Sequence, residues 1–266
     1  MRTVILAIGR EILRGRVQDT NSWTLARRLT GLGHEVIRIT SCDDGRAAIV
    51  REIRRAAEDG ASLVVTTGGL GPTDDDLTLR ALAEATGCPL TLHPEARELV
   101  AARYAALAQR GAVADGPMTA PREKMACLPQ GSTPLRNPVG AAPGVWLETG
   151  GMRYVALPGV PAEMRAILEE SVVPFLAARP SGAVYAERRI VTQARDESAV
   201  APVLRRMSGE LPEVYWKSHP ARFGSDVRME IFVSTWAGDP GAAEARLARA
   251  LSLLREALGE AAPPEA

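Results

Sequence analysis

The sequence has few cysteines, histidines and lysines, and it has no net charge. Cys42, Cys88 and Cys127 lie far apart and match neither a metal-binding nor a redox spacing. The three histidines are equally scattered, so a zinc site is not expected. Lysine occurs only at Lys124 and Lys217, and 32 basic residues balance 32 acidic ones. Nucleic-acid-binding proteins usually carry a basic excess, so no nucleic-acid partner is expected.

Long apolar runs are also missing. No segment approaches the roughly 20 apolar residues that a membrane-spanning helix needs. The N-terminus runs directly into a strand-like segment rather than a secretory signal. We therefore expect no membrane partner and a cytoplasmic location. The remaining composition is that of a globular protein, and 266 residues are enough for two domains.

Strand-like and helix-like segments alternate through the first 90 residues. An apolar run typical of a strand buried on both faces occupies residues 4–8, and further strands are expected at 35–40 and 63–65. The segments between and after them have helical spacing. This order predicts a parallel sheet with right-handed crossovers. Loops at the carboxyl ends of such strands lie together and bind ligands, which here means residues 9–21, 43–45 and 66–76.

The pattern changes near residue 180. Before it, helical spacing covers 94–109 and 161–178, and residues 154–157 are strand-like. RPSG at 179–182 is typical of a linker. After it, we expect a strand–helix–strand–strand–helix unit at 188–192, 197–207, 214–217, 227–236 and 241–258, with Asp196 as N-cap and a disordered tail. We therefore predict a phosphate-binding domain at 1–178 and a small α+β subdomain at 183–260.

The segment TTGGLGPTDDDLT, which begins at Thr66, has the composition of an anion-binding loop. Glycines let main-chain N–H groups approach a ligand closely. The start of the following helix adds unpaired N–H groups and a partial positive charge, which favour a phosphate. The loop lacks the G-K-[ST] of a P-loop, and Asp74 stands where the dinucleotide fingerprint needs a third glycine.

The aspartates of this loop allow two interpretations. Carboxylates repel a phosphate, but one or two of them hold a divalent ion such as Mg²⁺ together with phosphate oxygens. They also orient or deprotonate water. The structural alternative is a tight turn in which Asp76 is the N-cap of the next helix. The eleven residues from Thr66 to Asp76 exceed what a plain turn needs, which favours a ligand site.

At this point the chain resembles the N-terminal domain of the CinA family. The matching segments are IGREILRGRVQDTNS, TTGGLGPTDDDLT, KMACLP, NPVGAAPG and LPGVPAEM, which occur in family order. The resemblance implies a three-layer α/β fold with a mostly parallel sheet of the molybdopterin-binding, MogA/MoaB-like type, and a smaller C-terminal α+β subdomain. It also implies a homodimer. No stretch remains for the nicotinamide mononucleotide deamidase domain of longer CinA proteins, so we expect a stand-alone first domain.

The resemblance implies two possible functions, and Arg10 adds a third. The first is a metal-dependent (Mg²⁺- or Co²⁺-type) ADP-ribose pyrophosphatase that releases AMP and ribose 5-phosphate. The second is a molybdopterin-binding or adenylylating protein, as in MogA-type relatives. The third is a non-catalytic nucleotide-binding protein. The third is suggested by Arg10, because the family usually has an aspartate at this position and activity would suffer if that aspartate helped to hold the metal. We expect Arg10 to clamp a phosphate, to weaken metal binding, or to face solvent.

The candidate site residues follow from the loop and the resemblance. For catalysis we nominate Asp75, Asp76, Asp44, Glu11 and Lys124, with Asp75 and Asp76 as metal ligands. Main-chain N–H groups of 68–73 are expected to hold the diphosphate of the nucleotide substrate. Ligand contacts are predicted at Thr67, Gly68, Gly69, Gly71, Pro72, Thr73, Asp19, Asn21, Asn137, Gly140, Pro158 and Gly159. Asp19 and Asn21 alternatively cap a helix, Lys124 is alternatively a surface residue, and the last four are alternatively turn formers.

Overall fold

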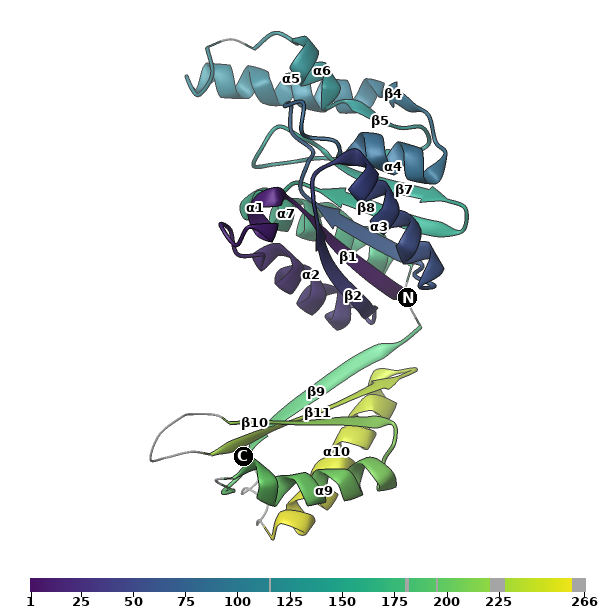
Figure 1. Ribbon diagram of the computed structural model, residues 1–266, viewed down its shortest axis with the longest axis vertical. Coiled ribbons are helices and arrows are strands. Elements are labelled where there is room, and N and C mark those ends of the chain that lie inside the picture. Colours follow the sequence, from purple (N-terminus) through teal and green to yellow (C-terminus); the bar gives the residue numbers. More distant parts are fainter. Residues whose placement is uncertain (115, 180–181, 195, 221–227, 260–266) are drawn as a thin grey trace. The chain divides into compact units, whose positions relative to one another are not determined.

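The computed structural model describes residues 1–114, 116–179, 182–194, 196–220 and 228–259 (Figure 1). The chain divides at Arg179 into two compact units. The predicted linker falls partly outside the described residues, and the predicted tail falls entirely outside them. Within the described residues, no helix combines the length and the hydropathy that crossing a bilayer requires.

The first unit is built on a six-stranded sheet with the order β2-β1-β3-β8-β7-β6. The neighbours β2, β1, β3 and β8 are parallel, whereas β7 is antiparallel to β8 and to β6. The predicted mostly parallel sheet is therefore confirmed. The strands are β1 (Arg2–Ile8), β2 (Glu35–Cys42), β3 (Leu63–Thr67), β6 (Thr133–Leu135), β7 (Gly144–Thr149) and β8 (Met152–Leu157).

Helices cover both faces of this sheet. The chain moves from β1 to β2 and then back past β1 to β3, and right-handed crossovers place the two connecting helices on opposite faces. A two-stranded sheet of β4 (Leu90–Leu92) and β5 (Cys127–Pro129) lies beside them. The helices are α1 (Arg10–Leu13), α2 (Thr20–Gly31), α3 (Arg46–Glu58), α4 (Thr78–Thr86), α5 (Pro94–Gln109), α6 (Ala120–Lys124), α7 (Pro161–Ile167), the π-helical η1 (Leu168–Val172) and α8 (Val173–Ala177).

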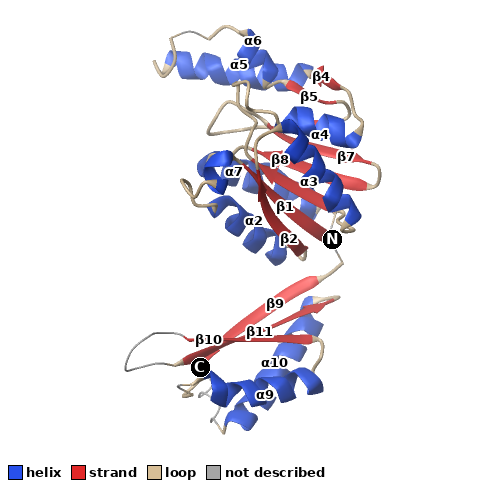
Figure 2. Ribbon diagram, in the orientation of Figure 1, coloured by secondary structure: helices blue, strands red, loops and turns tan. Residues whose placement is uncertain are grey.

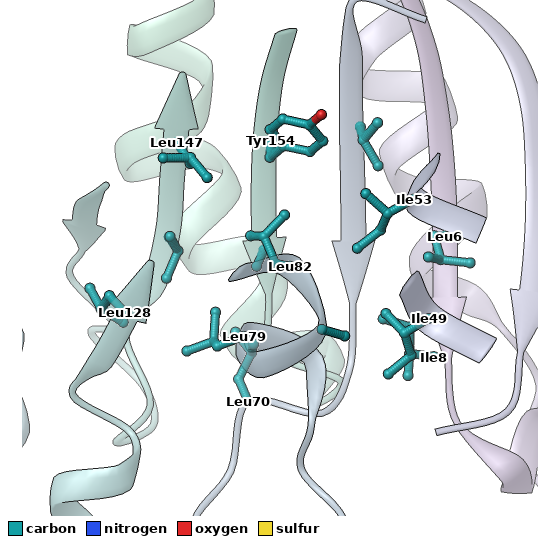
Figure 3. Close-up of a cluster of buried hydrophobic side chains, with 14 of the residues drawn as sticks. Leu6, Ile8, Ile49, Ile53, Leu70, Leu79, Leu82, Leu128, Leu147 and Tyr154 are labelled. Atoms are coloured by element: carbon teal, nitrogen blue, oxygen red, sulfur yellow. The ribbon is translucent and has the colours of Figure 1, made fainter. Parts of the chain in front are cut away.

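The core of the first unit explains why the sequence of β1 is a nearly continuous apolar run. Every residue from Thr3 to Ile8 is buried, because β1 has a helical layer on each side. On one face, Leu6 and Ile8 pack with Ile49 and Ile53 of α3 (Figure 3). Side chains from α4 and from the glycine-rich loop continue this cluster. The carboxyl ends of β1 and β3 are thereby fixed next to each other.

The helix predicted at 161–178 is interrupted. It forms α7, η1 and α8 rather than one regular α-helix. Pro174 has no N–H to donate to the carbonyl of Glu170, and its ring crowds that carbonyl, so the preceding turn widens to the π form. The short elements α1, β4, α6, β5, β6 and β7 were not predicted.

The second unit is a three-stranded antiparallel sheet with two helices on one face (Figure 2). The predicted order of elements is confirmed, although Val227 lies outside the described residues. Met229, Ile231 and Val233 are buried, as the alternating pattern indicates. Asp196 caps its helix, accepting a bond from Ser198 N–H at 2.9 Å. The elements are β9 (Val184–Val191), α9 (Glu197–Glu210), β10 (Val214–Pro220), β11 (Met229–Ala237) and α10 (Pro240–Leu258).

Candidate ligand-binding site

The glycine-rich loop leaves β3 where three strands end together. Gly68 has a φ of +109°, and its N–H donates to Leu157 O of β8 at 2.9 Å. A Cβ on Gly68 would overlap the main-chain oxygen of Ile8 in β1. The position therefore requires glycine for two reasons, the backbone angle and the close approach of a neighbouring strand.

Two side chains hold the next part of the loop. Leu70 is buried in the core cluster beside Leu79 and Leu82 of α4 (Figure 3). Thr78, the first residue of α4, donates its hydroxyl to Gly68 O at 2.7 Å and its N–H to Gly69 O at 3.2 Å. The loop is thus anchored through its carbonyls and one apolar side chain, not through the N–H groups of 69–71.

The main-chain N–H groups of Gly69, Leu70 and Gly71 have no hydrogen-bond partner within the described part of the chain. All three residues line one cavity of about 500 Å³. Of residues 68–73, from all of which the sequence predicts donors, only these three have a free N–H group among the residues described. The Gly68 N–H is taken by Leu157, Pro72 has none, and Thr73 N–H donates to Asp76 Oδ2 at 2.9 Å. Three consecutive unpaired donors beside a cavity are suited to an anion.

Lys124 binds the back of this loop rather than lining the cavity. Its Nζ donates to the main-chain carbonyls of Asp76 at 2.8 Å, Gly71 at 3.4 Å and Thr73. The ammonium therefore holds the loop closed and adds positive charge next to the free N–H groups.

Asp75 and Asp76 converge on one hydroxyl. Thr73 Oγ1 lies 2.5 Å from Asp75 Oδ1 and 2.6 Å from Asp76 Oδ2. This hydroxyl holds the pKa of Asp75 below its ordinary value, with a smaller contribution from the charges of Lys124 and Arg10. The alternative interpretation of Asp76 as helix N-cap is wrong. The residue before α4 is Leu77, and the Asp76 side chain instead closes the turn at Thr73.

Asp75 and Asp76 could supply at most two protein ligands to a divalent ion. Among the residues that the structure describes, no three His, Cys, Asp or Glu side chains are grouped to hold a metal. Asp76 lines the cavity, whereas Asp75 is exposed and is not part of the lining. A Mg²⁺-type ion there would need ligand phosphate and water for its remaining positions.

Arg10 is bound to two aspartates of the neighbouring loop. Its guanidinium contacts both Asp43 oxygens, at 3.0 and 2.9 Å, and Asp44 Oδ1 at 2.9 Å. The bonds from Arg10 hold the pKa of Asp43 well below its usual range. Burial raises the pKa of Asp44, despite the opposing charge of Arg10. Neither Arg10 nor Asp44 lines the cavity. Arg10 therefore binds carboxylates in this structure, which differs from the phosphate clamp and the solvent-facing side chain that the sequence suggests.

Asp19 and Asn21 stand at the start of α2. Asp19 Oδ1 accepts a bond from Ser22 N–H at 2.9 Å, which is the capping interaction predicted as its alternative. Asn21 is buried, and its Nδ2 donates to Thr67 Oγ1 at 2.9 Å and to Gly159 O at 2.8 Å. Its Oδ1 is buried without a partner among the described residues. Asn21 therefore ties α2 to the ends of β3 and β8.

Asn137 organises the loop before β7. It is buried, its Nδ2 donates to Ala142 O at 2.8 Å and its Oδ1 accepts from Gly140 N–H at 2.8 Å. The same Nδ2 donates to Glu163 Oε2 at 2.7 Å. Glu163 lines the cavity, but sequence reasoning missed it. Its position in LPGVPAEM, in the first turn of a helix that follows a parallel strand, was the available signal.

The cavity gathers most of the predicted site residues from segments far apart in the sequence. Half-exposed Val17 and Val160 add apolar walls. Thr73, Asp75, Asp44, Lys124, Asn137 and Gly140 are not part of the lining. The predicted residues that do line it are Glu11, Asp19, Asn21, Thr67, Gly68, Gly69, Gly71, Pro72, Asp76, Pro158 and Gly159.

This fold and loop define an α/β protein with a glycine-rich loop beside a cavity at the carboxyl end of a mostly parallel sheet. The family described as "probable molybdopterin binding domain" matches residues 4–178, and the chain belongs to it. The chain is similar to the crystal structure of CinA from Thermoplasma acidophilum, with 34% identity and a TM-score of 0.59 over 66% of this chain and 99% of that one. The resemblance to CinA is therefore confirmed.

Similarity to curated proteins extends through both units. A protein of Pyrobaculum calidifontis is 41% identical over 263 residues, which is 97% of each chain. A protein of Aeropyrum pernix is 43% identical over 261 residues, which covers 98% of this chain and 89% of the relative.

Proposed function

We propose that the cavity binds a phosphate-bearing pterin or nucleotide, with a molybdopterin-type compound as the favoured ligand class. The observation that carries the proposal is the run of unpaired N–H groups at 69–71 beside a cavity of about 500 Å³. Lys124 supplies positive charge behind this run, and the apolar walls suit a flat ring. The family match favours this function over hydrolysis of ADP-ribose.

Hydrolysis is the second candidate because the Asp76 carboxylate lines the same cavity as the free N–H groups. In that case Asp76, with Asp75 beside it, would hold a divalent ion or orient water against the phosphate. The ion would supply Lewis-acid stabilisation of the phosphate oxygens. The three N–H groups would hold the phosphate, and Asn21 would keep the β3 and β8 ends in register around it.

Calorimetry with the purified full chain tests the proposal. We expect saturable one-to-one binding of inorganic pyrophosphate, and tighter binding of a phosphate-bearing pterin, with EDTA present. If neither compound binds in the presence or absence of Mg²⁺, the proposed function is wrong. Release of AMP from ADP-ribose with Mg²⁺ or Co²⁺, measured by mass spectrometry and abolished by Asp76→Ala, would favour the hydrolase instead.

A further inference from the structure

Glu163 lines the cavity, and one oxygen of its carboxylate has no hydrogen-bond partner in the described part of the chain. Its Oε2 accepts a bond from Asn137 Nδ2 at 2.7 Å, while no partner for Oε1 is found in the described part of the chain. The residue stands in the first turn of α7, directly after the end of β8, and it lines the same cavity as the loop N–H groups. The cavity lining therefore includes residues with free main-chain donors from one loop and a residue with a carboxylate acceptor from another segment.

This carboxylate is held in place from two sides. Asn137 is itself fixed by Ala142 O and by the N–H groups of Val139 and Gly140. A Cβ on Gly140 would overlap the Glu163 carboxyl group. The missing side chain at 140 thus lets the carboxylate lie against the main chain. A preorganised acceptor of this kind discriminates between ligands better than a mobile one.

A carboxylate selects ring edges that carry adjacent N–H donors. The aminopyrimidinone edge of guanine or pterin presents a ring N–H next to an amino group, and both donate to one carboxylate. Adenine presents an amino group next to a ring nitrogen that is an acceptor, and this nitrogen would face a carboxylate oxygen. Hypoxanthine has the ring N–H but lacks the amino group.

We propose that Glu163 reads the ring of the bound ligand and selects an aminopyrimidinone over an adenine. The inference rests on the proposed function, since it names the ring that accompanies the phosphate. It assigns Glu163 a specificity role, with Asn137 as the residue that positions it.

The test compares GDP, IDP and ADP, which carry the same diphosphate, by calorimetry with the full chain. We expect GDP to bind about 10- to 100-fold more tightly than ADP, with IDP between them, because one or two hydrogen bonds to a charged group are lost. Glu163→Gln replaces one acceptor oxygen with a donor, and we expect it to reduce the preference for GDP to about threefold or less. The control is Glu170→Gln, the same change at an exposed carboxylate outside the cavity, which should keep the wild-type preference.

The outcomes separate this inference from the proposed function. If inorganic pyrophosphate and all three nucleotides fail to bind, both are wrong. If pyrophosphate binds while GDP and ADP bind equally, or if Glu163→Gln keeps the preference with an unchanged melting temperature, only the inference is overturned. A folded Glu163→Gln protein that has lost the preference supports it.

Discussion

Gly68→Ala is expected to destabilise the first unit by about 3 kcal/mol and to abolish pyrophosphate binding. The backbone angle of +109° is unfavourable for alanine, and the new Cβ would overlap Ile8 O, which belongs to a central strand and cannot move away. Relief of this overlap would push the loop away from β1 and shift the N–H groups that follow. Urea denaturation followed by circular dichroism gives the free energy of unfolding, and calorimetry gives the affinity.

Gly87→Ala is the matched control for this prediction. Gly87 also has a positive φ, +71°, but a Cβ there meets nothing within 4 Å. The free energy of unfolding of Gly87→Ala should fall by only about 1 kcal/mol, the cost of the backbone angle alone, and the variant should still bind pyrophosphate. If the two variants lose equal stability and Gly68→Ala still binds pyrophosphate, the close approach of β1 does not shape the loop.

Asn137→Asp is expected to lower the free energy of unfolding by about 2–4 kcal/mol at pH 7. The change keeps the shape of the side chain and the acceptor for Gly140 N–H. It replaces the donor to Ala142 O and to Glu163 with an oxygen, which places two carboxylates at 2.7 Å. The repulsion raises the pKa of the introduced carboxyl in the folded state.

The sign of the pH dependence follows from this shift. A carboxyl whose pKa is raised on folding destabilises the protein above that pKa, and the deficit shrinks as pH falls and the group takes up a proton. The stability difference from wild type should therefore be largest at neutral pH and smaller near pH 5, as measured by urea denaturation at each pH. Gln130→Glu, at an exposed amide, is the control and should show no such trend. A deficit that is independent of pH would contradict the assigned contact between Asn137 and Glu163.

Much of the fold was predictable because its elements have strong local signals. Residues 4–8 are apolar throughout, as a strand between two helical layers must be, and residues 229–233 alternate, as a strand covered on one face must. The short elements between residues 110 and 150 were missed. Strands of three residues, such as β5 and β6, contain too few positions to show a period.

The site was predictable only in part, for a physical reason. Gly69 and Asp76, which the loop chemistry nominates as a ligand contact and a metal ligand, both line the cavity. Whether a given N–H is free or bonded, however, depends on contacts with distant strands. The bond from Gly68 N–H to Leu157 O and the bonds from Lys124 to loop carbonyls join residues 48 to 89 positions apart, which no local pattern reveals. The bond that holds Glu163, from Asn137 Nδ2, likewise joins residues remote in sequence.

The most direct measurement is a titration of ¹⁵N-labelled protein with inorganic pyrophosphate, followed by amide resonances. We expect the N–H signals of Gly69, Leu70 and Gly71 to move together and to saturate with one common affinity. The signals of Gly68 and Thr73, whose N–H groups are bonded within the protein, should move much less. Saturable shifts elsewhere in the chain, with the three N–H signals of 69–71 unmoved, would contradict the central claim that these groups bind the phosphate.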